Sequence, residues 1–291
     1  MANEGKPIVN EVILTAALTG PIATKADNSA LPVSPEEIAT AARESYEAGA
    51  AVVHVHLRDE RGQPTADLKI AKRVIGLIEE ACPALIQLST GVGLAVEYED
   101  RVQLVEARPR MATLNVCSMS FGTGEFRNPP EGVRRLAARM AELGVKPELE
   151  LYDTGHLEVA LALEAEGLLE PPLQFSLVLG VLGGMAGTAA NLVQLVNRLP
   201  PDSVWQVIGI GRNNLPMTAI GLAMGGNART GMEDTLMMQR GVPTSGNRQL
   251  VERLAAIAEA LERPAVGAER ANELLHLKPY VQTRGGRDHE T

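Results

Sequence analysis

Short runs of apolar residues recur along the chain, and each is followed by a longer segment with the spacing of an amphipathic helix. The runs are bounded by turn residues and contain few polar positions, as expected for strands that are buried on both faces. They predict strands at residues 12–17, 51–57, 85–89, 111–116, 148–152, 173–179, 204–210 and 227–230. The last run has the weakest pattern of the set.

Helices are predicted in the gaps between these strands. The clearest start is Ser34-Pro35-Glu36-Glu37, with a capping serine, a proline at the first helical position and acids in the first turn. Gly49 is placed to end this helix. The other predicted helices cover residues 67–80, 97–107, 131–143, 157–166, 189–199, 216–224, 247–262 and 268–275.

Near-continuous apolar strands that alternate with helices indicate a parallel sheet covered by helices. Eight such units fit the size of a (β/α)₈ TIM barrel, which takes about 250 residues. We therefore expect one TIM-barrel domain over residues 1–291, with the last two helices packed outside the barrel or against a second subunit. An open, doubly wound sheet is the alternative.

Composition narrows the function classes. The net charge is −9, the pI is about 5.2, and no basic cluster stands out beyond the short tail at 284–287, so we expect neither nucleic acid nor membrane as a partner. Residues 171–197 carry no charge, but their prolines, glycines and amide side chains argue against a membrane span. Two isolated cysteines and a polar N-terminus without a signal-peptide pattern lead us to expect a cytoplasmic protein.

The second predicted strand contains two histidines, His54 and His56. Alternate residues of a strand point to the same face, so the two imidazoles lie side by side. Zinc sites often combine two histidines with a carboxylate and an open position, which makes this pair a candidate for two of three ligands. Hydrogen bonds to core or loop groups, without any metal, are the competing interpretation.

A third ligand is available in the loop after the eighth predicted strand. In a closed barrel this strand is separated from the histidine strand only by the first strand, so Glu233 can reach the same metal. Asp234 and Arg229 lie in the same segment, and they offer a proton acceptor and a cation that suits a carboxylate. Glu233 could instead be a solvated surface acid, and Arg229 and Asp234 could simply pair to hold the loop.

Other polar residues lie where the predicted strands end, which is where TIM-barrel enzymes place their active sites. Ser89 and Thr90 precede a glycine-rich turn at Gly91, whose backbone amides could approach an anion or a carbonyl oxygen. The other candidates are Thr113, Asn115, Glu148 and Glu150. The glycine loops lack a dinucleotide-binding fingerprint, so NAD is not expected.

Eight separate stretches resemble the β-keto acid cleavage enzymes. They are LTAALTG at 14–20, LPVSPEEIA at 31–39, HVHLRDERGQP at 54–64, QLSTGVG at 87–93, MATLNVCSMSFG at 111–122, ELELYDTG at 148–155, LVLGVLGGMAG at 177–187 and ARTGMEDT at 228–235. The resemblance covers nearly the whole chain in order. It implies a TIM barrel, usually a homotetramer, that carries one zinc ion and condenses a β-keto acid with acetyl-CoA to give acetoacetate and a new acyl-CoA.

The resemblance also implies roles for particular residues. His54, His56 and Glu233 would bind zinc, while Ser89, Arg229 and Asp234 would handle the substrate carboxylate and the proton. The expected substrate contacts are Thr113, Ser89, Thr90, Gly91, Glu150, Asn115 and Ile22. Members that use an amino-keto acid have a glutamate at the position of Ile22, so we expect a substrate with a neutral or apolar side chain.

Two other functions are compatible with a His-x-His pair in a barrel. One is a zinc hydrolase of the amidohydrolase type, but that class needs further histidine and lysine ligands, and this chain has only five histidines. The other is a non-catalytic scaffold braced by zinc, but a structural site is normally closed by four protein ligands, and no fourth Cys or His is evident.

Overall fold

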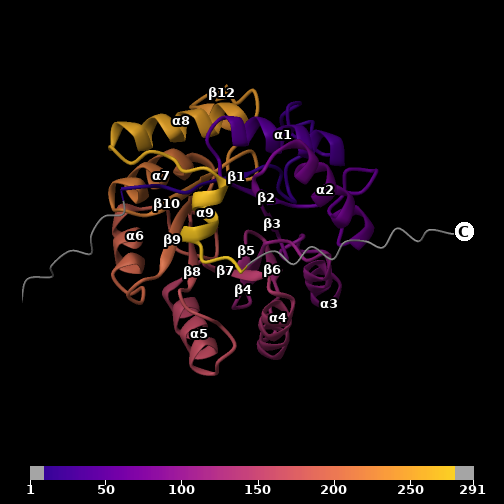
Figure 1. Ribbon diagram of the computed structural model, residues 1–291, viewed down its shortest axis with the longest axis vertical. Coiled ribbons are helices and arrows are strands. Elements are labelled where there is room, and N and C mark those ends of the chain that lie inside the picture. Colours follow the sequence, from indigo (N-terminus) through magenta and orange to yellow (C-terminus); the bar gives the residue numbers. More distant parts are fainter. Residues whose placement is uncertain (1–9, 279–291) are drawn as a thin grey trace, which may run out of the picture.

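The strands of the computed structural model, which describes residues 10–278, close into a parallel barrel with helices around it (Figure 1). This confirms the predicted TIM barrel and excludes the open sheet. The barrel order is β1, β10, β9, β8, β7, β4, β3, β2. The strands are β1 (Leu14–Ala17), β2 (Val52–Val55), β3 (Leu85–Leu88), β4 (Met111–Asn115), β7 (Lys146–Leu151), β8 (Gln174–Leu179), β9 (Val204–Gly209) and β10 (Asn227–Thr230).

Each strand places apolar residues against the surrounding helices and polar residues inside the barrel. The register pairs His54 with Gln87 on the neighbouring strand, and Glu148 with both Thr113 and Gln174. Gln87 on β3 bonds to Glu148 on β7 across the intervening β4, so these side chains meet in the barrel interior. The apolar positions between them, such as Val53 and Leu149, belong to the core under the helices.

The helices follow the predicted positions with small shifts at their ends. Ser34 caps the first helix with the full capping box, in which its hydroxyl accepts from Glu37 N and the Glu37 carboxylate accepts from Ser34 N. The predicted helix at 97–107 is a single α-helical turn followed by a 3₁₀ segment, α3 (Tyr98–Arg101) and η1 (Val102–Ala107). The others are α1 (Pro35–Glu47), α2 (Leu68–Ala81), α4 (Pro130–Leu143), α5 (Thr154–Ala165), α6 (Ala189–Val196), α7 (Asn214–Ala223), α8 (Asn247–Ala260) and α9 (Ala268–Leu274).

The last two helices have different positions. The first of them, α8, packs against α7, α1 and the two strands β1 and β10, and so completes the helical ring. The short helix α9 lies in front of the strands in Figure 1 and packs through Ala268 and Ala271 on residues where strands begin, including Val52 and Met111. It covers the N-terminal end of the barrel and leaves the opposite end to the βα loops.

Two hairpins were not predicted. One consists of β5 (Met119–Phe121) and β6 (Gly124–Phe126), and the other of β11 (Met237–Gln239) and β12 (Val242–Pro243). Both lie in loops that follow barrel strands, after β4 and after β10. Their strands are too short to give a pattern of alternating apolar residues, so the sequence does not distinguish them from irregular loops.

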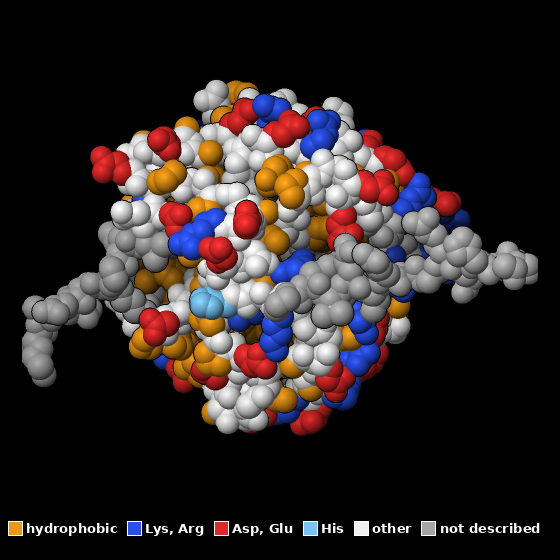
Figure 2. Space-filling view, viewed as in Figure 1, with side chains coloured by type: hydrophobic (Ala, Val, Ile, Leu, Met, Phe, Trp, Pro, Cys, Tyr) orange, Lys and Arg blue, Asp and Glu red, His pale blue; other side chains and the backbone are white. Residues whose placement is uncertain are grey.

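Surface charge and helix hydropathy bear on the possible partners of the protein. On the face seen in Figure 2, acidic and basic side chains are intermixed. The uncharged stretch at 171–197 forms β8, a loop and α6. Across residues 10–278, none of the helices combines the length and apolar character that a bilayer-crossing segment requires.

A tight glycine turn connects β10 to the loop that carries Glu233. Gly231 has φ +149°, and a Cβ placed there would lie 2.1 Å from the carbonyl oxygen of Ala17 on β1. That oxygen accepts the backbone N–H of Glu233 at 3.2 Å. The absence of a side chain at residue 231 therefore allows this loop to pack directly on β1.

We expect Gly231→Ala to lower the free energy of unfolding by at least about 2 kcal/mol, because the methyl group must displace backbone and φ is unfavourable for alanine. Denaturant unfolding would measure the change. Gly76→Ala in α2 is the control, since its added Cβ meets nothing within 4 Å. The control should be neutral or slightly stabilising. Equal free energies of unfolding for the two variants would contradict the conclusion that the loop needs a glycine at residue 231 to pack on β1.

Candidate active site and metal centre

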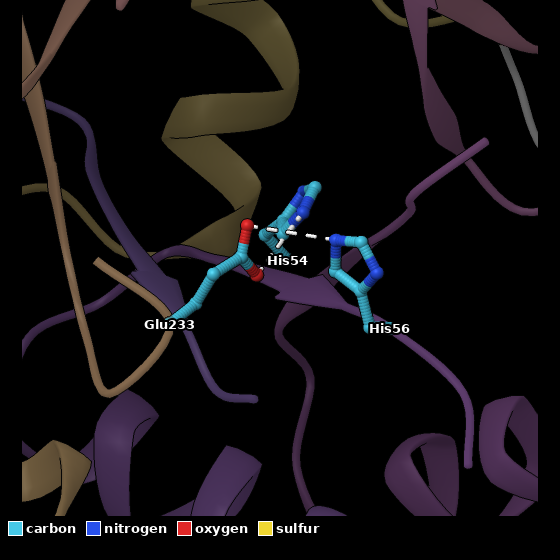
Figure 3. Close-up of side chains that lie close together, drawn as sticks. All are labelled: His54, His56 and Glu233. Carbon is cyan, nitrogen blue, oxygen red and sulfur yellow. Dashed lines mark ion pairs between the residues drawn. The ribbon is translucent and has the colours of Figure 1, made fainter. Parts of the chain in front are cut away.

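Two histidines and a glutamate from distant parts of the chain converge at the C-terminal end of the barrel (Figure 3). His54 lies in β2, His56 directly follows that strand, and Glu233 lies in the loop after β10. Nε2 of His54 is 3.4 Å from Glu233 Oε2, and Nε2 of His56 is 3.5 Å from Glu233 Oε1. One potential ligand atom from each residue lies within 4.8 Å of the other two.

These distances suit a shared cation. Two ligand atoms that are each about 2.0 Å from a tetrahedral zinc ion lie about 3.3 Å apart. Nε2 of His54 and Oε2 of Glu233 are both buried and make no hydrogen bond to another described group. Buried polar atoms without partners are costly, so this arrangement favours a ligand between them.

The hydrogen bond on the other side of the His54 ring strengthens this interpretation. Nδ1 of His54 lies 2.6 Å from the carbonyl oxygen of the Gln87 side chain, which can only accept. Nδ1 therefore carries the proton, and in the neutral ring Nε2 presents a lone pair to the Glu233 carboxylate. Two acceptors that face each other need a cation or a shared proton between them, and metal-bound histidines are commonly oriented in this way.

The electrostatics keep Glu233 ionised. Burial acts to raise the pKa of its carboxyl, but Arg229 and the two imidazoles outweigh that effect and hold the pKa well below its usual range. Burial acts to lower the pKa of His54, and the charge of Glu233 outweighs it and raises the pKa overall. The centre of the site is therefore an anionic group beside nitrogen ligands.

Arg229 links Glu233 to Asp234. Its Nε and Nη2 donate to the two carboxylate oxygens of Asp234 at 3.0 and 2.7 Å, and Nη2 also donates to Glu233 Oε1 at 2.6 Å. Burial raises the pKa of Asp234 to about 6, while Arg229 acts in the opposite direction. Arg229 and Asp234 thus form the loop-holding pair that the sequence allowed as an alternative.

Arg229 keeps one donor for another partner. Its Nη1 atom is buried, makes no hydrogen bond among the described residues, and is 3.8 Å from Glu150 Oε1. An arginine with two nitrogens engaged in hydrogen bonds is held in a fixed orientation, so Nη1, which makes only the longer contact with Glu150, can donate to a carboxylate or carbonyl oxygen. Arg229 can therefore hold the loop through Asp234 and also bind a substrate oxygen through Nη1, so the two interpretations from the sequence are compatible.

The ends of β3 and β4 are tied together. The backbone N–H of Thr90 donates to Thr113 Oγ1 at 2.9 Å, and the Thr90 hydroxyl donates to the carbonyl oxygen of Thr113 at 2.8 Å. Ser89 Oγ accepts the N–H of Gly91 at 3.1 Å, which leaves its hydroxyl hydrogen free to donate elsewhere. These four residues lie together as predicted, but most of their polar atoms already have protein partners.

Asn115 differs from them because both polar atoms of its side chain are buried and without a hydrogen bond in the described structure. A Cβ built on Gly91 would lie 3.8 Å from its Nδ2 and 3.3 Å from Ser89 Oγ, so these groups surround one space. Asn115 and Ser89 therefore offer a donor and an acceptor beside a turn that has no side chain.

Three residues near this site were given no specific role in the sequence analysis, although Glu148 was among its candidates. Tyr152 donates its hydroxyl to Glu150 Oε2 at 3.1 Å and lies under the first hairpin, 5.9 Å from the Phe121 ring. The others are Gln87, described above, and Glu148. Gln87 could have been noticed as the one polar residue in the apolar run at 85–88. Glu148 could have been noticed from the alternation of acidic and apolar residues at 148–151.

The loop after β1 brings Gly20 and Ile22 to the same end of the barrel. A Cβ on Gly20 would lie 2.8 Å from Glu233 Cγ, so a side chain there would displace the glutamate. Ile22, two residues further on, is 74% exposed. His156, in the first turn of α5, accepts the N–H of Tyr152 at 3.3 Å.

Comparison with known proteins identifies the family of this chain. Residues 11–277 match the family model described as beta-keto acid cleavage enzyme. A 3-keto-5-aminohexanoate cleavage enzyme from Acetoanaerobium sticklandii is 37% identical over 271 residues, which cover 92% of this chain and 99% of that protein. A 3-oxoadipate:acetyl-CoA acetyltransferase from Cupriavidus necator is 34% identical over 277 residues, with 94% and 97% covered.

A 3,5-dioxohexanoate:acetyl-CoA acetone transferase from Paraburkholderia graminis is 30% identical over 303 residues, with 94% and 98% covered. Among solved structures, apo ObcA has a TM-score of 0.71 at 20% identity and covers 85% of this chain and 65% of its own. At that identity the similarity supports the barrel fold alone.

Proposed function

The chain belongs to the beta-keto acid cleavage enzyme family, and we propose that it is a zinc-dependent member that condenses a β-keto acid with acetyl-CoA. An acyl transfer of this kind is the activity that the names of its relatives describe. The products would be acetoacetate and a new acyl-CoA. The convergence of His54, His56 and Glu233 is the observation that carries the zinc part of the proposal.

The reaction needs no oxidant or reductant. The acetyl group leaves the sulfur of CoA and joins the carbon that bears the substrate carboxylate, and the original acyl group takes its place on the sulfur. A bound zinc ion supplies Lewis-acid stabilisation for negative charge on the keto oxygen. His54, His56 and Glu233 would hold the ion.

The remaining roles fall to side chains around that position. Asp234, whose two oxygens are held by Arg229, would take a proton from the carbon between the two carbonyl groups. Arg229 Nη1 and the Ser89 hydroxyl would bind the substrate carboxylate. The remaining substrate contacts we propose are Thr90, Gly91, Thr113, Asn115, Glu150 and Ile22.

We propose that the substrate side chain is neutral or apolar. The names of the relatives include an amino acid derivative, a dicarboxylic acid and a neutral dioxo acid, so family membership leaves this open. Here Ile22 offers no charge, and Glu150 already accepts from Tyr152 and lies near Arg229. A cationic side chain would therefore have to share Glu150 with Tyr152 and Arg229, which weakens that pairing.

We expect 3-ketohexanoate to be turned over with a kcat/KM at least about tenfold above that of 3-keto-5-aminohexanoate, because burying an ammonium without an acidic partner of its own is unfavourable. Acetoacetate formation from each keto acid with acetyl-CoA measures the ratio. Ile22→Glu should reduce or reverse the preference for 3-ketohexanoate. A clear preference of the wild-type enzyme for the aminated substrate would contradict the proposed specificity, and failure of all keto acids would contradict the reaction.

From the family resemblance we propose a homotetramer, and from the two isolated cysteines we propose a cytoplasmic location. Sedimentation equilibrium of the purified protein tests the first, and fractionation of the source cells tests the second.

A further inference from the structure

A layer of buried polar side chains lies in the barrel next to His54. Gln87, Glu148, Gln174, Ser176 and Gln206 come from β3, β7, β8 and β9, and each is at most 6% exposed. Polar groups in such a position destabilise a fold unless they are paired. Their arrangement therefore has to be explained by the hydrogen bonds among them.

One carboxylate oxygen organises the layer. Glu148 Oε2 accepts from Gln87 Nε2 at 2.6 Å, from Gln174 Nε2 at 3.0 Å and from Gln206 Nε2 at 3.1 Å. Only the NH₂ end of a glutamine amide can donate to this oxygen. The carboxylate therefore fixes which way each of the three amides is turned.

For Gln87 this orientation has a consequence at the proposed metal centre. With its NH₂ group directed to Glu148, its carbonyl oxygen is directed to His54 and accepts the proton of Nδ1 at 2.6 Å. A reversed amide would place NH₂ against Nδ1 and favour the tautomer that carries its proton on Nε2. That tautomer could not use Nε2 as a ligand atom, because neutral imidazole binds metals through its unprotonated nitrogen.

We propose that Gln87 is a positioning residue that fixes the tautomer and ring orientation of His54, and that Glu148 acts through it by holding the Gln87 amide in the required orientation. The inference rests on the proposed function only in the statement that His54 binds metal. A purely structural layer would stabilise the barrel without selecting one His54 tautomer, and this difference makes the two interpretations testable.

The experiment compares Gln87→Met with Gln174→Met in the full chain. Both changes remove one amide from the same carboxylate oxygen, but only Gln87 contacts His54. In metal-free protein, ¹⁵N chemical shifts of the imidazole rings identify the His54 tautomer. Its signal is assigned among the five histidines by its loss in His54→Ala. Zinc affinity is then measured by competition with a chelating dye.

We expect the wild type and Gln174→Met to carry the His54 proton on Nδ1, and Gln87→Met to lose this preference. Zinc affinity should fall about 10- to 100-fold in Gln87→Met, as for other groups that orient a metal ligand, and stay within about threefold in Gln174→Met. An unchanged tautomer in Gln87→Met, or equal losses in both variants, would overturn the proposal. If Gln87→Met does not fold, Gln87→Asn replaces it, because the shorter amide cannot span both partners.

Glu148→Gln tests the second part of the proposal, that Glu148 acts by orienting the Gln87 amide. The carbonyl oxygen of a glutamine can still accept all three amides, so both the Nδ1-protonated tautomer and zinc affinity should remain close to those of the wild type. Loss of that tautomer would show that the carboxylate acts in some way other than by orienting Gln87. Because the tautomer is measured without metal, a wild-type protein that binds no zinc would refute the proposed function and still leave this inference decided.

Discussion

Replacing Glu233 with glutamine is expected to abolish measurable acetoacetate formation and to weaken zinc binding by more than about a hundredfold. Loss of a group that only orients a ligand costs about 10- to 100-fold in metal affinity, so loss of an anionic ligand should cost more. The glutamine also leaves Arg229 with a weaker acceptor than the carboxylate oxygen at 2.6 Å. Zinc content after dialysis and kcat with acetyl-CoA measure the two effects.

Glu60→Gln provides the control for the change in charge. Glu60 is an exposed acid in the loop after β2, close in sequence to His56. Zinc content and kcat of this variant should match those of the wild type. An undiminished zinc content in Glu233→Gln would remove Glu233 from the ligand set, and with it the metal centre proposed here.

Asp234→Asn is expected to lower kcat by about 10²- to 10⁴-fold while zinc remains bound. An amide cannot take up the substrate proton, and losses of this size are usual when a general base is removed. The variant keeps one oxygen that can accept from Arg229, so the loop should remain in place. Steady-state kinetics and zinc analysis of the same preparation separate the two properties.

The matched control is Asp202→Asn, since Asp202 is exposed, remote from the site in the turn before β9, and has φ +62°, which asparagine tolerates. It should have wild-type kcat. Asp234→Asn with unchanged kcat would assign the proton transfer to another group. Loss of zinc from this variant would instead indicate that Asp234 acts by supporting Glu233.

The barrel could be predicted because its determinants are local. Most strands are apolar runs bounded by turn residues, and α1 begins at a capping box that can be recognised from four residues. The strand at 227–230 has only one apolar residue, and its position in the strand–helix alternation indicated it. His54 and His56 share a short segment, so their proximity follows from strand geometry alone. Glu233 required one further step, the closure of the sheet between β1 and β10, which the structure confirms.

The rest depends on contacts between distant segments. Gln87 and Glu148 are far apart in the sequence, and only the closed barrel shows that the glutamine lies between His54 and the glutamate. Tyr152 was missed for the same reason, because its role comes from its bond to Glu150 and its packing under the hairpin at 119–126. No local pattern marks such residues, since each is ordinary in its own strand.

The pairing of the first and last barrel strands also has a consequence for biosynthesis. His54 and His56 leave the ribosome early, but the acid that faces them is separated from them by most of the chain and reaches them only when β10 pairs with β1. A nascent chain that ends before residue 233 cannot form the three-residue cluster. Metal loading would therefore be a late event in maturation, and an ion held by residues from β2 and from the loop after β10 would stabilise the closed ring against opening.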